Sequence, residues 1–178
     1  MLITTSRRLS SKTRNLCKEL EEVLPLSFYL PRGKKTLREL IDLAYEKGME
    51  RICIVETVER EPRRLSFIKV DLDWEWIGYI DVSVSLRGKK IPPVEEDIEL
   101  CISGNGKYIG DIACFFNAYH GDSYAIIHLE NDTINFYRKD INNDLIGPEM
   151  KILSLHRYDV NGKKDQNKDI HSKKGYSL

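Results

Sequence analysis

The chain has 178 residues, of which 41% are hydrophobic, enough for the core of one domain or of two small halves that share it. It contains no run of 18 apolar residues, which argues against a membrane-spanning helix and a membrane partner. The 28 Lys and Arg residues balance 28 Asp and Glu residues, so the total charge by itself argues against a nucleic-acid partner.

The first 90 residues predict strands that alternate with two helices and then pair with one another. In chain order we expect a strand at Leu2–Thr5, a helix from Ser10 or Ser11 to Pro25, a strand at Leu26–Leu30, a helix at Thr36–Lys47, and strands at Arg51–Val55, Leu65–Val70 and Trp76–Leu86. Thr36 and Glu39 have the spacing of a capping box, which defines the start of the second helix. The segment Glu56–Arg64, which contains Pro62, is predicted to be a charged loop.

A second cycle of elements follows the basic connection at Arg87–Pro93. We expect a strand at Ile98–Ser103, a helix at Tyr108–Tyr119, a hairpin of Ser123–Glu130 and Thr133–Tyr137, and a last strand at Met150–Leu155. Residues 158–178 are polar and are predicted to form a mobile tail. The two cycles together predict a mixed α/β (α+β) fold.

The charges are distributed unevenly along the chain. Residues 1–70 hold 15 basic and 10 acidic side chains, residues 71–150 hold 6 and 15, and residues 151–178 hold 7 and 3. A basic segment can bind phosphate, whereas an acidic one can repel phosphate or meet a basic protein partner.

The N-terminus and the cysteines indicate the compartment. The N-terminus lacks the basic-then-apolar order of a secretory signal, so we expect a soluble, cytoplasmic protein. The four cysteines, Cys17, Cys53, Cys101 and Cys114, are far apart and form no C-x-x-C pair. They predict reduced, buried thiols and neither a disulfide framework nor a zinc site. No metal and no cofactor are expected.

The segment Leu30–Leu40 places four cations on a turn that enters the second helix. These cations are Arg32, Lys34, Lys35 and Arg38. If the first strand and the second helix meet at the same edge of a sheet, Arg7, Arg8, Arg32 and Lys34 converge on a phosphate site. The alternative is a solvated surface loop, and Gly33 is then a turn residue without a ligand. Among the nearby aromatic residues, Phe67 is predicted to be core, and Tyr29 is left open between core packing and base stacking.

The main competing motif is Gly104–Gly110, which follows a strand and opens a helix. Its spacing is one residue longer than the dinucleotide-binding fingerprint G-x-G-x-x-G, and it lacks the Ser or Thr of a phosphate-binding P-loop. A tight turn is the simpler interpretation, and a nucleotide-binding enzyme remains a third hypothesis. Neither the histidines nor the serines form a catalytic pattern, so no enzyme is expected.

Trp74 and Trp76 flank Glu75 beside two aspartates. Exposed tryptophans of this kind can anchor a protein partner, although tryptophans that cover a sheet explain the pattern as well. The second hypothesis is therefore an adaptor that binds a protein partner through the acidic part of the chain.

Several motifs occur together in this chain: Ile3–Arg7, the Ser-Ser-Lys-Thr-Arg sequence that ends at Arg14, the Arg32–Lys34 turn followed by Leu37–Leu40, and the segment Ile146–Ile152. This combination resembles the Brix-domain family. The chain is similar to the short, single-domain archaeal members over about residues 1–157. The resemblance implies two similar α/β halves, about 1–90 and 91–157, related by a pseudo-twofold axis. Each half would resemble an anticodon-binding domain.

The resemblance implies a role in ribosome biogenesis without catalysis. The expected partner is ribosomal RNA or its precursor, and a ribosomal or assembly protein is a possible second partner. Arg7, Arg14, Arg32, Gly33 and Lys34 match the family pattern, and charge adds Arg8, Lys35 and Arg38. The expected RNA-binding residues are therefore Arg7, Arg8, Arg14, Arg32, Gly33, Lys34, Lys35 and Arg38.

Overall fold

The computed structural model describes residues 1–88, 91–92, 98–139 and 145–158. The N-terminal half contains β1 (Leu2–Thr5), α1 (Ser11–Val23), β2 (Phe28–Tyr29), α2 (Leu37–Glu46), β3 (Arg51–Val58), β4 (Glu61–Val70) and β5 (Trp74–Ser85). The C-terminal half contains β6 (Leu100–Gly104), α3 (Ile109–Phe116), β7 (Tyr119–His120), β8 (Ala125–Glu130), β9 (Thr133–Arg138) and β10 (Leu145–Arg157). The mixed α/β fold is confirmed. Apart from Tyr158, the predicted tail at 158–178 lies outside the described residues.

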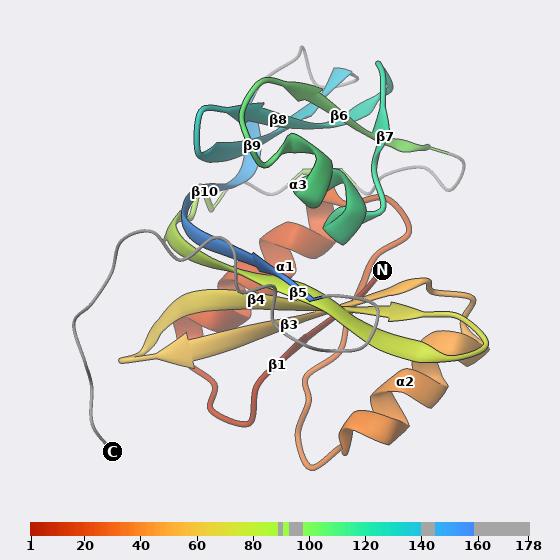
Figure 1. Ribbon diagram of the computed structural model, residues 1–178. Coiled ribbons are helices and arrows are strands. Elements are labelled where there is room, and N and C mark those ends of the chain that lie inside the picture. The colour runs from red at the N-terminus through yellow and green to blue at the C-terminus, as the bar shows by residue number, and fades with distance from the viewer. Residues whose placement is uncertain (89–90, 93–97, 140–144, 159–178) are drawn as a thin grey trace.

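All the strands belong to one curved, ten-stranded sheet in the order β2-β1-β3-β4-β5-β10-β9-β8-β6-β7 (Figure 1). In the N-terminal half β1 pairs in parallel with β2 and β3, and in the C-terminal half β6 pairs in parallel with β7 and β8. The remaining neighbours are antiparallel, and β5 joins β10 across the middle. The order of pairing is therefore the same in both halves when each is followed from its edge strand.

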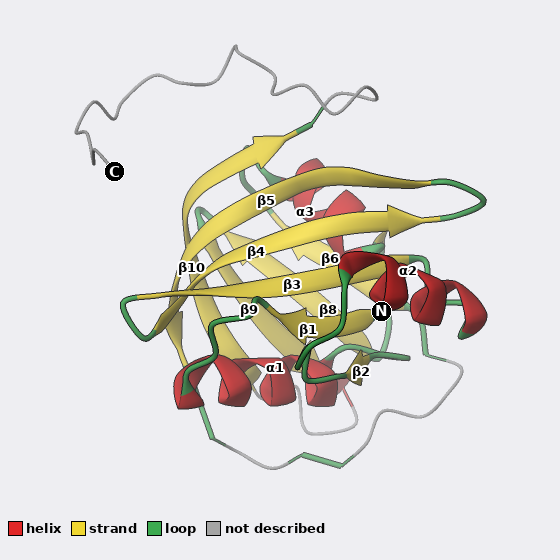
Figure 2. Cartoon of the chain, turned by 90° about the horizontal axis from the view of Figure 1, so that it is seen from below, coloured by secondary structure: helices red, strands yellow, loops and turns green. Residues whose placement is uncertain are grey.

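The helices cover the sheet unequally. The curved sheet encloses α1 and α3, whereas α2 lies against the outer face of the N-terminal half (Figures 1 and 2). The inner core contains buried residues of both halves, among them Leu16, Phe67, Phe115 and Phe136. The outer core under α2 is smaller and includes Leu40, Ile41, Ile52 and Ile68. Alternate residues of β3 face the two cores, which is why Arg51–Val55 reads as a continuous apolar run.

Side-chain caps define where α1 and α2 begin. Ser10 Oγ accepts a hydrogen bond from the Thr13 amide at 3.1 Å. Thr36 Oγ1 accepts from the Glu39 amide at 3.2 Å, and the Glu39 carboxylate accepts from the Thr36 amide at 2.7 Å. The predicted capping box is thus present, and both helix starts agree with the sequence analysis.

The predicted loop at Glu56–Arg64 is wrong, because this segment is a β-hairpin of β3 and β4. Glu59 and Arg60 form its two-residue turn with φ of 51° and 67°, values that are typical of a type I′ turn but usually belong to Asn or Gly. Pro62 lies where the register shifts, at a position where a strand tolerates the loss of an amide donor.

Two boundaries in the C-terminal half also differ from the prediction. The helix expected at Tyr108–Tyr119 spans only Ile109–Phe116, because Asn117 takes a left-handed conformation and the chain then enters β7. The last strand extends well beyond Met150–Leu155 on both sides. It tolerates Gly147 and Pro148 because its pairing with β9 is irregular between Ile146 and Met150.

Three of the four cysteines, Cys17, Cys53 and Cys101, are buried free thiols, as predicted. Cys114 is also a free thiol but is only partly buried. Burial raises the pKa of Cys17 to about 12, so its thiol is protonated and unreactive. Among the described residues no helix has both the length and the apolar character that crossing a membrane requires.

Candidate nucleic-acid interface

The turns that follow β1 and β2 lie next to each other. β1 and β2 are parallel neighbours, with Ile3 opposite Tyr29, so their carboxyl ends share one edge of the sheet. The Leu30 amide donates to the Ile3 carbonyl at 2.9 Å and Thr4 Oγ1 donates to the Leu30 carbonyl at 2.8 Å, which continues the contact to the strand ends. Both turns lie in the lower part of Figure 1. The side chains of Arg7 and Arg8 therefore start beside that of Arg32.

The cations on these turns are accessible and have no acidic partner among the residues that the structure describes. Arg7, Arg8, Lys34 and Lys35 are exposed, and Arg32 is half-buried. Within the described part of the chain none of the five forms an ion pair. Since their charge is not neutralised by neighbours, they form a positively charged surface, which we call the basic corner.

The turn that carries Lys34 and Lys35 is fixed by its backbone. The Lys35 amide donates to the Arg32 carbonyl at 3.0 Å, and Arg32 Nε donates to the Lys35 carbonyl at 3.3 Å. Gly33 has φ of +55°, a left-handed conformation that favours glycine. No atom lies within 4 Å of the position a Cβ would take at Gly33, so the backbone angle, and not crowding, explains this glycine.

Two helices begin at the same corner and differ in their potential. α1 has a neutral serine cap and no acidic residue in its first turn, so the positive end of its dipole is not compensated. At α2 the Glu39 carboxylate accepts from the Thr36 amide and hydroxyl, which lowers the pKa of Glu39 and keeps it ionised. The dipole of α2 is therefore partly neutralised, and α1 contributes more to anion attraction.

Arg14 extends the basic corner along α1. Its side chain is exposed, and its charge opposes the rise that burial causes in the pKa of Tyr29. Tyr29 is half-buried and packs against the inner core. The sequence left Tyr29 open between core packing and base stacking, and the structure places it mainly in the core; Phe67 is fully buried, as predicted.

The structure separates the other cations from this corner. Arg38 is exposed on α2 and pairs with Asp42 at 2.9 Å, one turn along the helix. Lys12 pairs with Glu61 at 2.5 Å. Arg64 donates to both oxygens of Asp81 and lies 3.8 Å from the centre of the Tyr79 ring, so it belongs to the sheet. Of the expected residues, Arg38 is therefore the least available for phosphate.

The glycines of Gly104–Gly110 have structural explanations. A Cβ at Gly104 would lie 2.0 Å from the Leu129 carbonyl oxygen, and one at Gly106 would lie 2.6 Å from the Asn131 carbonyl oxygen. The neighbouring hairpin of β8 and β9 thus occupies the space that a phosphate group would need on that side. The turn packs against the protein itself, as the simpler interpretation predicted.

No family model matches the chain. It is 34% identical to a probable Brix domain-containing ribosomal biogenesis protein of Pyrococcus horikoshii, over 85% of this chain and 82% of that protein. A protein of the same description from Thermococcus kodakarensis is 33% identical over 90% of this chain and 83% of its own length. The chain belongs to the family of Brix domain-containing ribosomal biogenesis proteins. The suspected resemblance is confirmed.

Solved structures show that the Brix-family fold extends to more distant proteins. A crystal structure of a probable ribosomal biogenesis protein from Aeropyrum pernix superposes with a TM-score of 0.72 at 24% identity, over 85% of this chain and 93% of that one. Mil, an archaeal Imp4-like protein, gives a TM-score of 0.68 at 20% identity, over 87% and 97% of the two chains.

Two cations have acidic partners that the sequence analysis did not assign. Arg38 was expected to bind RNA but pairs with Asp42, and Arg64, at the end of the predicted charged loop, pairs with Asp81. An acid four residues after Arg38 is a visible signal for its pair, whereas the partner of Arg64 lies on another strand and is not.

Proposed function

We propose that this protein acts in ribosome biogenesis by binding ribosomal RNA or its precursor through the basic corner, without catalysis. The observation that supports the proposal most strongly is the convergence of Arg7, Arg8 and Arg32 at one sheet edge, with no acidic partner in the described parts of the chain. Lys34, Lys35 and Arg14 enlarge the same surface. Arginine forks match phosphate oxygens, and an unpaired cluster at a helix N-terminus favours a polyanion.

The printed descriptions of the archaeal relatives support the assembly role, because they name ribosomal biogenesis proteins. A place of action in the cytoplasm is part of this proposal. We further propose that residues 1–157 form one Brix domain, whose halves of about 1–90 and 91–157 are related by a pseudo-twofold axis between β5 and β10. The matching order of strand pairing supports this symmetry, and each half would then resemble an anticodon-binding domain.

The proposal is tested by measuring binding to ribosomal RNA fragments by fluorescence anisotropy at several salt concentrations. The variant Arg7→Ala/Arg8→Ala/Arg32→Ala removes three cations. Because each neutralised phosphate adds about 0.7–0.9 to the slope of log affinity against log salt, we expect the slope to become shallower by about 2–3.

The matched control is Lys107→Ala/Lys151→Ala, which removes two exposed cations from the C-terminal half. We expect its affinity and slope to remain close to those of the unmodified protein. If the triple variant kept the full slope, or if the control lost as much affinity, the basic corner would not be the RNA site.

A further inference from the structure

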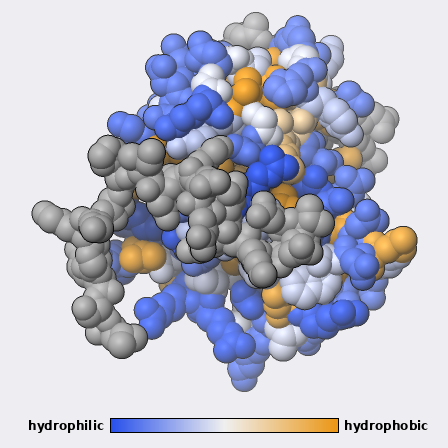
Figure 3. Space-filling view, in the orientation of Figure 1, coloured by the Kyte–Doolittle hydropathy of each residue, from blue (hydrophilic) through white to orange (hydrophobic). Residues whose placement is uncertain are grey.

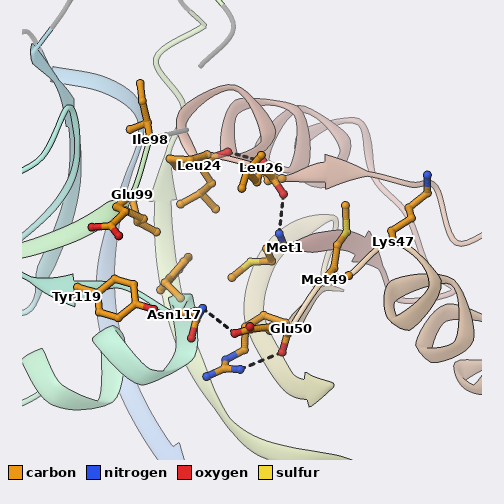
Figure 4. A pocket seen from close by; sticks show the side chains of 16 residues that line it. Met1, Leu24, Leu26, Lys47, Met49, Glu50, Ile98, Glu99, Asn117 and Tyr119 are labelled. Atoms are coloured by element: carbon orange, nitrogen blue, oxygen red, sulfur yellow. Dashed lines mark hydrogen bonds between the residues drawn. The ribbon is translucent and has the colours of Figure 1, made fainter. Parts of the chain in front are cut away.

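A groove lies between the two halves, close to both edges of the sheet. It has a volume of about 680 Å³, and Figure 4 shows its walls. The N-terminal wall includes Leu26 and Met49, and the C-terminal wall includes Leu100, Phe116 and Tyr119. Leu26 and Tyr119 are 64% and 61% exposed, so apolar surface continues from the groove onto its rim.

The two edge strands of the sheet begin at this groove. Ser27, which precedes β2, and Tyr119, the first residue of β7, both line it. An edge strand has backbone donors and acceptors on one side that no strand of the sheet uses, and an extended segment can pair with them. The groove therefore combines apolar surface with backbone groups that suit an extended chain.

The turn between β4 and β5 presents apolar and acidic side chains together. We call Asp71–Glu75 the acidic tip. Leu72 is 89% exposed and Trp74 is 38% exposed, and both are flanked by carboxylates. Among the described residues neither Asp71 nor Asp73 has an ion-pair partner. Figure 3 shows a mostly hydrophilic face on which apolar atoms reach the surface in only a few places.

The acidic tip follows a strand end that is hydrogen-bonded to a residue of the groove lining. The Val70 amide, at the end of β4, donates to the Glu50 carbonyl at 2.9 Å, and Glu50 lines the groove. The Glu50 carboxylate accepts from Asn117 Nδ2 at 3.1 Å, between the two walls. Glu99, on the far wall, has no ion-pair partner in the described part of the chain.

The cations of this region have contacts within the chain. Arg51 is buried, and its guanidinium donates to the Cys114 and Glu50 carbonyls. The Lys47 ammonium lies 5.4 Å from the centre of the Phe28 ring. Lys47 stays exposed, but among the described residues of this region the carboxylates of Asp71, Asp73, Glu50 and Glu99 outnumber it.

We propose that the acidic tip and the groove form one docking surface for an extended, basic segment of a partner protein. Apolar side chains of that segment fill the groove and cover Leu72 and Trp74, while its Lys and Arg side chains face Asp71, Asp73 and Glu50. The surface lies at the opposite end of β3 and β4 from the basic corner, because β3 runs parallel to β1 and the tip follows the end of β4. RNA and the partner segment can therefore bind together, and the inference does not rest on the proposed RNA site.

The test is selection of 12-residue peptides from a random phage-displayed library on the immobilised full chain. We expect selected peptides with Leu, Ile or Phe beside Lys or Arg. A synthetic copy of the most enriched peptide is then titrated by fluorescence anisotropy. Asp71→Lys/Asp73→Lys and Leu72→Asn/Trp74→Ser should each weaken its binding at least tenfold, as should Leu26→Asn. Leu26 has φ of 50°, a conformation that asparagine tolerates well, so the last variant should fold.

The control is Leu153→Asn, which changes a leucine that is 56% exposed on β10, away from the groove lining. It should leave peptide binding unchanged. The proposal is overturned if no peptide is enriched, if the enriched peptides are acidic, or if the tip variants bind as tightly as the unmodified chain. RNA affinity measured on the same tip variants should not fall, so the outcome is independent of the basic corner.

Discussion

The two halves of the molecule pair their strands in the same order but present different chemistry at corresponding positions. In the N-terminal half the turns after the parallel strands β1 and β2 hold Arg7, Arg8, Arg32, Lys34 and Lys35. In the C-terminal half the turns after β6 and β7 hold one cation, Lys107, and one acid, Asp122. Asp122 is paired with Lys139 at 2.5 Å. The order of strand pairing is repeated, and the cluster of cations is placed on one copy of it.

The halves also differ in the segment that follows the edge strand, which is β2 in one half and β7 in the other. After β2 the chain forms the basic turn and α2, whereas four residues, Gly121–Tyr124, connect β7 to β8. Helix α2 covers the outer face of its half and fixes the turn that begins it. The comparison teaches that an inserted helix with a strong cap can convert a sheet edge into a charged, rigid surface.

The largest expected effect tests whether the halves are one folding unit. Phe67 on β4 stacks on Phe115 of α3 with ring centres 4.9 Å apart, and Phe116 lies 5.2 Å away. Removing this fully buried ring should lower the free energy of unfolding by about 3–5 kcal/mol. Urea denaturation of Phe67→Ala followed by circular dichroism measures the loss.

The control for Phe67 is Val58→Ala, at a side chain that is 52% exposed, which should change stability little. An average substitution lowers the free energy of unfolding by about 1 kcal/mol. A loss below about 1 kcal/mol for Phe67→Ala would show that the two halves do not share the inner core. Separate unfolding transitions for the two halves of the unmodified protein would show the same.

A smaller effect is expected where α1 holds the chain as it leaves the N-terminal half. The buried Glu19 carboxylate accepts hydrogen bonds from the Arg87 and Gly88 amides at 3.1 Å and 2.9 Å. Glu19→Ala should cost about 1.5–3 kcal/mol, because two amides lose a charged acceptor. Glu19→Gln keeps one acceptor oxygen, so its free energy of unfolding, measured by urea denaturation, should lie between those of Glu19→Ala and the unmodified protein. Equal stability of all three would contradict this role.

The N-terminal cap of α2 belongs to a helix that the N-terminal half has and the described part of the C-terminal half does not. Thr36→Ala removes the oxygen that accepts from the Glu39 amide and should cost about 1 kcal/mol in thermal or urea unfolding. Ser10→Ala provides the comparison at α1, with an effect of similar size. If Thr36→Ala left stability unchanged, the capping box would not define the start of α2.

The smallest effect concerns pH. Hydrogen bonds from Thr36 lower the pKa of Glu39 in the folded state below its unfolded value. The stability that Glu39 contributes is therefore complete above the unfolded pKa and is lost as the pH falls through the folded pKa. Carboxylates titrate between about pH 3 and pH 7. In unfolding curves measured across this range, Glu39→Gln should lose less stability on acidification than the unmodified chain. Parallel losses in the two proteins would contradict this assignment.

Residue patterns predicted those parts of the fold that depend on local chemistry. Capping residues and helical spacing located α1 and α2, and strict alternation located β5. The β3–β4 hairpin was missed because Glu59 and Arg60 are residue types that seldom adopt the left-handed turn conformation they have here. The extent of β10 was missed because Gly147 and Pro148 usually interrupt strands.

The candidate site was predictable only in part, for a physical reason. The cations were visible in the sequence, but whether each was neutralised depended on strands that are distant in the chain, as for Arg64 and Asp81. The acidic segment 71–150 is also divided by the fold. Asp71, Asp73, Glu75 and Asp81 lie in the N-terminal half, so residues 1–88 hold 16 basic and 14 acidic side chains. The asymmetry lies in the placement of the charges more than in the net charge of each half.

The most direct test of the central claim is ultraviolet crosslinking of the full chain to a ribosomal RNA fragment, followed by mass spectrometry of the crosslinked peptides. The account predicts crosslinks within residues 6–14 and 30–36, and none within residues 104–108 or 121–124. Crosslinks confined to the C-terminal turns, or spread equally over the corresponding turns of both halves, would contradict it.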